Sequence, residues 1–343
     1  MKPVLKLVTF SLAVALPFVL VSAGFAADIK ERNIKIGIGL TEDHPQGQSV
    51  KKFAEIVAAK SGGKIKVKLF AGGALGNDVT MVSALQGGTQ EMTIPDTSTL
   101  VGQIKDFGVI NFPFLFNNEQ EADAVLDGPF GDKLLAKLPE KGLIGLAFWE
   151  NGFRQTTNSK RPITKVKDYD GLKLRVMQNP LFIETFKTLG ANAVPMAFTE
   201  LFTAMETKTV DGQENPVPTI KASKFNEVQK YLTLTKHTYS VWVLMMSKKY
   251  WDTLTPDEQK LLREAAIESR DYERKTIRAA GTQALSDLKL AGMKVNELPP
   301  AEVVKLREKA QPVIAKYTIE FGEPVSKELF SELQKVRAKG GKK

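Results

Sequence analysis

The chain has 343 residues, no cysteine and only two histidines, His44 and His237. These counts exclude disulfide bonds, a cysteine nucleophile, lipid attachment through cysteine and a metal site built on closely spaced histidines. The formal net charge is +9, and a basic surface attracts nucleic acid, anionic membranes or anionic solutes. The length is too great for one simple core and predicts two domains.

Residues 1–26 have the layout of a secretory signal peptide, with a basic start, an apolar run over 7–21 and small residues before Ala27. The apolar run is shorter than the roughly 20 residues that span a bilayer. We therefore expect cleavage and export to the periplasm, with an uncleaved membrane anchor as the alternative. Export excludes nucleic acid as a partner. Lys2 and Lys6 are the only charged side chains of this segment, so its removal lowers the net charge to +7.

Short β-branched runs alternate with helical periodicity in the first half of the chain. The expected strands are 34–38, 64–70, 92–94 and 143–148, and the expected helices are 47–60 and 79–85. This alternation predicts an α/β sheet with helices on its faces.

The same alternation returns beyond Asn151 and predicts a second α/β lobe. The expected strands are 172–176, 193–195 and 239–246, and the expected helices are 180–189 and 200–206, with a turn at Asp211-Gly212. No linker rich in proline or serine separates the halves, so the chain is expected to cross between the lobes more than once.

A long helix is expected from Pro256 to about Leu290. Thr255 is a good N-cap, proline occupies the first helical position and two acidic residues follow in the first turn. Gly281 either marks a bend in this helix or is simply tolerated. Residues 336–343 are basic and are expected to form a frayed, solvated tail.

Two arginines and an asparagine stand at predicted strand ends or turns in the segments 151–158, 171–176 and 210–216. They are Arg154, Arg175 and Asn215. An arginine presents a planar fork of donors that matches a carboxylate bidentately, so two such forks predict a carboxylate ligand. No Gly-Lys-Ser/Thr phosphate loop or complete dinucleotide motif occurs, which argues against a nucleotide site.

These three segments resemble the signature of the DctP-type periplasmic substrate-binding proteins of TRAP (tripartite ATP-independent periplasmic) transporters. Further matching segments extend the resemblance over nearly the whole mature chain: 53–55, 63–67, 75–78, 112–116, 195–200 and 225–231. The resemblance implies an α/β, two-lobe periplasmic-binding-protein fold (type II-like), with the ligand cleft between the lobes and the long helix crossing both. Lobe I is expected at 27–151 plus 240–279, and lobe II at 152–239 plus 280–335.

The family implies a protein that captures a small organic acid in the periplasm. It delivers this acid to the small and large membrane subunits of the transporter. No cofactor or metal is expected, and a monomer is assumed because the sequence leaves the oligomeric state open. A sensor module that presents the same acid to a receptor is one alternative. An enzyme that acts on the acid through Asp78, Asp96 or His44 is another, although few groups titrate near neutral pH.

Arg175 is expected, from the resemblance, to be the principal carboxylate anchor. Arg154 either contacts the same carboxylate, contacts a second acidic group, or forms a salt bridge that braces Arg175. Asn215 precedes a proline, so its backbone is expected to be extended while its amide serves a carboxylate or hydroxyl. An asparagine in this position is also common in turns.

Three polar candidates lie in the first lobe. Asp96 corresponds to a polar contact that varies in the family, Asp78 is either a second contact or an acid at a helix N-terminus, and His44 is either a donor to the ligand or an exposed loop residue. The two acids favour a hydroxylated ligand, but a C4-dicarboxylate, a sugar acid or a 2-hydroxy acid would each satisfy Arg175.

Two aromatic residues, Phe198 and Trp242, either pack against the carbon chain of the ligand or belong to the core. Gln178, with its neighbours Met177 and Asn179, is a candidate for setting selectivity.

Overall fold

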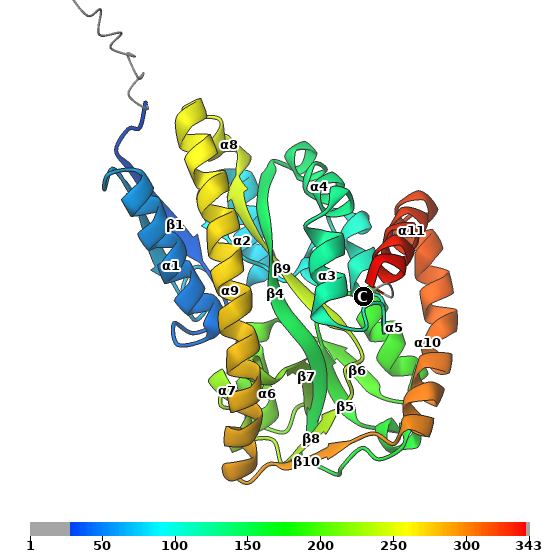
Figure 1. Cartoon of the computed structure of the whole chain (residues 1–343). Helices are drawn as coiled ribbons and strands as arrows, with labels where there is room; N and C mark the ends of the chain where they lie inside the picture. The colour runs from blue at the N-terminus through cyan, green and yellow to red at the C-terminus, as the bar shows by residue number, and fades with distance from the viewer. Residues whose placement is uncertain (1–27, 341–343) are drawn as a thin grey trace, which may run out of the picture.

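The computed structural model describes residues 28–340, so the expected signal peptide and residues 341–343 lie outside the described part. Its strands form one sheet, shown in Figure 1. In order across the sheet they are β2 (Ile65–Phe70), β1 (Arg32–Gly37), β3 (Met92–Thr93), β9 (Tyr239–Ser247), β4 (Leu143–Asn158), β7 (Gly212–Pro216), β5 (Lys173–Val176) and β6 (Asn192–Pro195). Two more strands extend the sheet beside β4: β8 (Tyr231–Leu234) pairs with β4, and β10 (Lys294–Glu297) pairs with β8.

Helices cover both halves of this sheet (Figure 1). They are α1 (Pro45–Lys60), α2 (Asp78–Gly87), α3 (Glu119–Leu126), α4 (Pro129–Leu135), α5 (Pro180–Thr188), α6 (Leu201–Glu206), α7 (Val217–Ala222), α8 (Lys248–Trp251), α9 (Pro256–Leu290), α10 (Pro300–Phe321) and α11 (Glu323–Gly340). Two short 3-10 helices matter for the site, η1 (Thr97–Leu100) and η5 (Phe198–Glu200). None of the helices within residues 28–340 combines the length and hydrophobicity needed to cross a membrane.

The expected strands and helices are all present within a few residues of their expected bounds. The main difference is β4, which runs to Asn158 instead of ending at Phe148. Its second part carries Arg154, Gln155 and Asn158, polar residues that are nonetheless buried. Buried polar side chains do not produce the apolar pattern by which a core strand is recognised.

The sheet divides into two halves that meet at β4 and β9. In the first half β1 is parallel to β2 and β3, and in the second half β5 is parallel to β6 and β7. β4 is antiparallel to β9 over its first part and to β7 over residues 154–158, so one strand passes through both halves. Separate hydrophobic clusters form on each half. The expected two-lobe α/β fold is confirmed.

Helix α9 runs along both halves, as Figure 1 shows. Its first part, including Leu262 and Ala265, packs in the cluster that contains side chains of β1 and α1. Its last part, including Ala284 and Leu288, packs in the cluster of α6 and α7. Arg278 also bonds Glu150 of β4, with 2.6 Å between Nε and Oε2. The expected long helix is thus present over its predicted length and is continuous through Gly281.

The C-terminal helices contact both halves. Val313 and Tyr317 of α10 and Leu333 of α11 pack in a cluster that joins many first-half side chains and Leu181 of α5, and Tyr317 donates to Glu184 of α5 at 3.1 Å. The expected assignment of 280–335 to lobe II stays a prediction. Residues 336–340 continue α11 rather than fraying. Arg337 explains this order, since its guanidinium bonds both carboxylate oxygens of Glu121 at 3.1 and 2.9 Å.

The role of Gly281 can be tested by Gly281→Ala. The nearest atom to an added methyl group would be Cγ of Pro218 at 3.9 Å, an ordinary contact. We expect the free energy of unfolding to rise by about 0.5–1 kcal/mol, because alanine loses less backbone entropy in a helix than glycine. Urea unfolding measures this change.

Gly47→Ala in α1 is the matched control and should destabilise, because its methyl group would lie 2.6 Å from the backbone oxygen of Thr41. A loss of stability in Gly281→Ala would instead mean that α9 requires glycine at this point, as a bend would.

Candidate ligand-binding site

A pocket lies between the two halves of the molecule. The first half contributes Asn77 and Asp78, β9 contributes Trp242, and the second half contributes Arg175 and Phe198. The pocket encloses about 610 Å³ not filled by atoms, a volume that includes its opening to solvent. Within residues 28–340, no group of three or more histidine or acidic side chains is arranged to hold a metal ion.

Arg175 extends from β5 into this pocket. The residue is only 2% exposed, and its Nε donates to the carbonyl oxygen of Met196 at 2.9 Å. Its terminal nitrogen Nη1 is buried and has no hydrogen-bond partner among the described residues. Burial lowers the pKa of Arg175 to about 10, with Glu214 opposing and Arg154 adding to this shift. The side chain therefore remains a cation at pH 7 and has an N–H group free for an anion.

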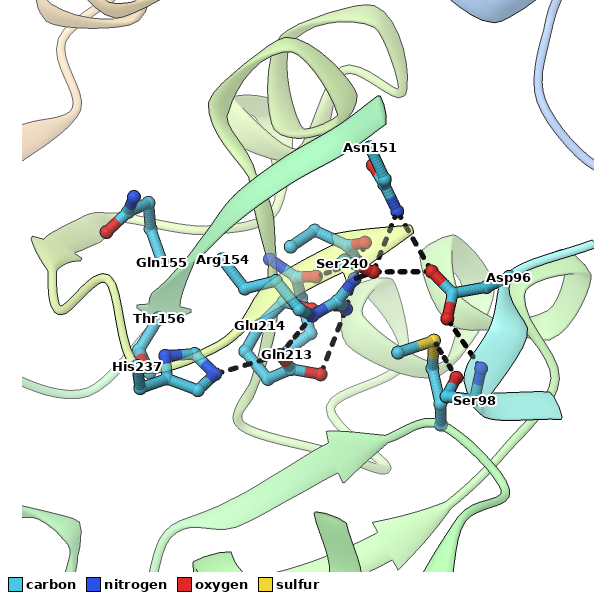
Figure 2. A network of polar contacts seen from close by, with 12 residues as sticks. Asp96, Ser98, Asn151, Arg154, Gln155, Thr156, Gln213, Glu214, His237 and Ser240 are labelled. Carbon is cyan, nitrogen blue, oxygen red and sulfur yellow. Dashed lines mark hydrogen bonds and ion pairs between the residues drawn. The ribbon is translucent and has the colours of Figure 1, made fainter. Parts of the chain in front are cut away.

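Arg154 lies on β4 and is fully buried, but its charge is already paired. It forms an ion pair with Glu214 of β7, in which Nη2 lies 3.0 Å from Oε1 and Nε contacts Oε2. Nη1 donates to Oγ of Ser240 at 3.2 Å. Figure 2 shows these contacts around the guanidinium. Of the expected alternatives, the structure therefore contains a salt bridge at Arg154, and the residue also lines the pocket.

Glu214 is the partner that sequence reasoning left unassigned. Its side chain is fully buried and also contacts Nε2 of His237 at 3.0 Å. Burial alone would raise the pKa of Glu214, but the Arg154 charge and hydrogen bonds from His237 and Arg154 outweigh it and hold the pKa below its usual value. One signal in the sequence could have identified this residue. A buried arginine requires an acidic partner, and Glu214, next to Asn215, is one of the two acids of the 210–216 segment.

Asn215 lies in β7, in an extended conformation rather than in a turn. Its Oδ1 accepts from Arg154 Nη2 at 3.1 Å, and its Nδ2 donates to Oε1 of Gln213 at 2.5 Å. Asn215 lines the pocket. An amide nitrogen carries two hydrogens, so one N–H of Asn215 is left for a bound molecule.

Asp78 occupies the first position of α2 and lines the pocket opposite this basic wall. The expected acid at a helix N-terminus is thus present, and contact with a ligand stays a prediction that its place on the pocket wall allows. Its Oδ2 accepts from the backbone N–H of Asp96 at 3.2 Å. Burial raises the pKa of Asp78 to about 6, although this N–H and the charge of Arg175 favour the ionised form. The carboxyl group is thus mostly ionised at pH 7 and largely protonated below pH 6.

Asp96 and His44 lie behind the pocket wall and are not among its lining residues. Asp96 caps η1 through Ser98 N–H at 3.0 Å, and its second oxygen accepts from Asn151 at 3.2 Å (Figure 2). The expectation of an exposed loop histidine is wrong, since His44 is fully buried. It caps α1 by accepting the N–H of Gln46 at 2.9 Å.

The remaining candidates lie on the pocket wall. Trp242 is 3% exposed and also belongs to the core of the first half, while Phe198 is half-buried and packs near Phe225 with 6.0 Å between ring centroids. Gln178 is exposed. Met177 and Thr219 also line the pocket. Thr219 was not expected there, because a threonine in a short helix gives no signal of its own.

The chain is similar to known proteins over most of its length. The model of the DctP family, described as bacterial extracellular solute-binding protein, family 7, matches residues 36–320. The 2,3-diketo-L-gulonate-binding periplasmic protein YiaO of Escherichia coli is 36% identical over 282 residues, which are 81% of this chain and 86% of that protein.

Two solved structures are similar along most of the chain. A sugar acid binding protein from Advenella mimigardefordensis in complex with galactonate is 49% identical, with a TM-score of 0.89, and the match covers 90% of this chain and 100% of that one. A TRAP periplasmic solute binding protein from a Polaromonas species, bound to D-erythronate, is 39% identical with a TM-score of 0.84 and covers 87% and 98%. With the family model matching most of its length, the chain belongs to the DctP family of extracellular solute-binding proteins.

Proposed function

We propose that this solute-binding protein captures a small hydroxylated monocarboxylic acid between its lobes and delivers it to the membrane subunits of a TRAP transporter. The observation that carries the proposal is the buried Arg175, whose Nη1 has no hydrogen-bond partner within residues 28–340. A buried charge without a partner is unfavourable, so a carboxylate in the pocket would relieve a cost that the empty protein bears.

The neighbouring Arg154 supports a single carboxylate rather than two. Its charge is matched by Glu214, so the basic wall carries about one net positive charge. We assign Arg175 the bidentate contact with the carboxylate. Arg154 and Asn215 each add one N–H, either to the same carboxylate or to a hydroxyl group beside it.

The opposite wall favours hydroxyl groups. An ionised Asp78 accepts hydrogen bonds but repels a second carboxylate. A polyhydroxylated chain attached to one carboxylate fits both walls. The ligands named for two similar proteins, galactonate and D-erythronate, are acids of this kind, and we therefore place the ligand among the sugar acids rather than the C4-dicarboxylates.

The other residues complete the proposed site. Trp242 and Phe198 would pack against the carbon chain of the ligand, and Gln178 would donate or accept at the pocket mouth. His44 and Asp96 would act from behind the wall by holding its residues in place. We assign no catalytic step to any of them and infer binding without turnover.

The proposed cellular setting follows from the family and the N-terminal pattern. Residues 1–26 would direct export, and the mature protein would work in the periplasm as a monomer. Lobe I would comprise 27–151 plus 240–279, and lobe II would comprise 152–239 plus 280–335. Delivery to a permease is preferred over presentation to a receptor, because named relatives and structural neighbours are TRAP binding proteins.

The anchor is tested by Arg175→Met, which removes the charge and keeps an unbranched side chain. Loss of one partner of a buried charge pair costs about 3–5 kcal/mol, so the affinity for galactonate or D-erythronate should fall at least about 100-fold. The ligand-free variant should be no less stable than the wild type, because an unpaired buried cation is lost. Calorimetric titration and urea unfolding measure the two quantities.

Arg161→Met is the matched control, because the Arg161 guanidinium bonds the backbone oxygens of Asp168 and Asp170. It should bind as the wild type does. Undiminished affinity in Arg175→Met would refute the proposed anchor.

The role of Asp78 is tested with tartrate, a hydroxylated dicarboxylate whose carboxyl groups are stronger acids than Asp78. Protonation of Asp78 removes the repulsion, so tartrate affinity should rise about tenfold as the pH falls from about 7.5 to about 6. Asp78→Asn should bind tartrate more tightly at pH 7.5 and lose this pH dependence.

The exposed Asp252, which pairs with Lys248 on the surface, supplies the control Asp252→Asn. If Asp78→Asn still excludes tartrate, the discrimination between one and two carboxylates lies elsewhere in the pocket.

A further inference from the structure

Two sets of polar contacts pass from the first half of the molecule to the second beside the pocket. At the start of α1, Nε2 of His44 lies 3.1 Å from Oγ1 of Thr219 in α7. In η1, Oγ of Ser98 contacts Sδ of Met177 at 3.1 Å, and its carbonyl oxygen accepts from Nδ2 of Asn179 at 3.2 Å. All five residues are buried. Thr219 and Met177 line the pocket, whereas His44 and Ser98 do not.

The orientation of the His44 ring is fixed by its neighbours. Nδ1 accepts the N–H of Gln46, so the ring proton lies on Nε2 and is donated to Thr219. The ring packs against Trp242 in an edge-to-face pair, with 5.6 Å between centroids. Burial lowers the pKa of His44 to about 3, so the imidazole is neutral and keeps this single tautomer at physiological pH.

The contact continues to the connection between the halves. Because the Thr219 hydroxyl accepts from His44, its own proton is free to point to Oδ1 of Asn151, which lies 3.4 Å away. Asn151 in turn donates to Asp96 at 3.2 Å and to Ser240 at 3.2 Å. A chain of aligned donors and acceptors therefore joins α1, α7 and β4.

We propose that the His44–Thr219 hydrogen bond is a latch that holds the two lobes closed over the ligand and slows its release. The inference rests on the proposed capture of an acid between the lobes. If the lobes separate, contacts within each lobe persist and those between them break. His44 has both ring nitrogens engaged by protein atoms, so it acts as a positioning residue and does not bind the ligand.

A hydrogen bond suits this purpose because water replaces it when the lobes part. Its net contribution is small compared with its gross strength, so the latch prolongs closure without making it permanent. A protein that must release its ligand to a partner requires such a reversible contact. The latch should therefore change mainly the dissociation rate of the ligand.

Two substitutions isolate the latch. His44→Asn keeps an oxygen that can cap α1, since asparagine is a good N-cap, but its side chain is too short to reach Thr219. Thr219→Val removes the hydroxyl and keeps the shape. Each should raise the dissociation rate of galactonate about tenfold, the effect of losing one buried hydrogen bond. Stopped-flow displacement measures the rate, with D-erythronate as the probe if galactonate does not bind.

The double variant distinguishes a latch from two local effects. Because both substitutions break one contact, the double variant should dissociate no faster than the faster single variant. The proposal would be overturned if the double variant dissociated faster by the product of the two single effects. It would also be overturned if His44→Asn dissociated at the wild-type rate. Arg175→Met reports separately on ligand capture, because it should lower the affinity at least about 100-fold, whereas each latch variant should lower it only about tenfold, through the dissociation rate.

A second measurement uses no ligand. The chain has no native cysteine, so Lys66→Cys on β2 and Glu206→Cys on α6, both at exposed positions, accept one spin label in each half. Distance distributions should shift towards longer separations in His44→Asn and in Thr219→Val, with no further shift in the double variant. Identical distributions in the wild type and both single variants would show that the contact does not hold the lobes together.

Discussion

The site depends on the ion pair between Arg154 and Glu214. Two guanidinium groups buried beside one another repel, and each alone would lose hydration without compensation. Glu214 cancels one of these charges and contributes to keeping Arg175 protonated. His237 and Ser240 hold the members of the pair from either side. The remaining positive charge therefore lies at one defined point of the pocket wall, and recognition of an anion follows from this arrangement.

The sequence was sufficient for the order of most strands and helices, because apolar periodicity and N-cap residues are local signals. It was also sufficient to name Arg154, Arg175 and Asn215. It did not reveal which of the two arginines is already paired, because Glu214 contacts Arg154 across two strands that are far apart in the chain. The second part of β4 was missed because its buried residues are polar.

His44 and Asp96 also show that the sequence does not reveal which polar residues face the pocket. Both stand after strands of the first half, where ligand contacts were expected, and both instead complete hydrogen-bond networks behind the wall. A polar residue near a pocket can bind the ligand or hold a residue that does, and only the direction of the side chain separates the two. The expectation of a frayed tail was wrong for residues 336–340 for a related reason. Arg337 bonds the buried Glu121 of the distant helix α3, and no local pattern in the sequence signals this contact.

The passage of β4 through both halves has a mechanical consequence. A linker of irregular chain would let two lobes reorient freely. A strand that is hydrogen-bonded to neighbours on both sides resists twisting and allows only limited elastic bending. Its pairing with β9 is interrupted between Glu150 and Gly152, and Gly152 has a positive φ of 105°. This interruption is the point of β4 with the least support from its neighbour, and Asn151, which lies within it, also lines the pocket. If the lobes move, the bending point of the strand and the binding surface therefore share the same residues.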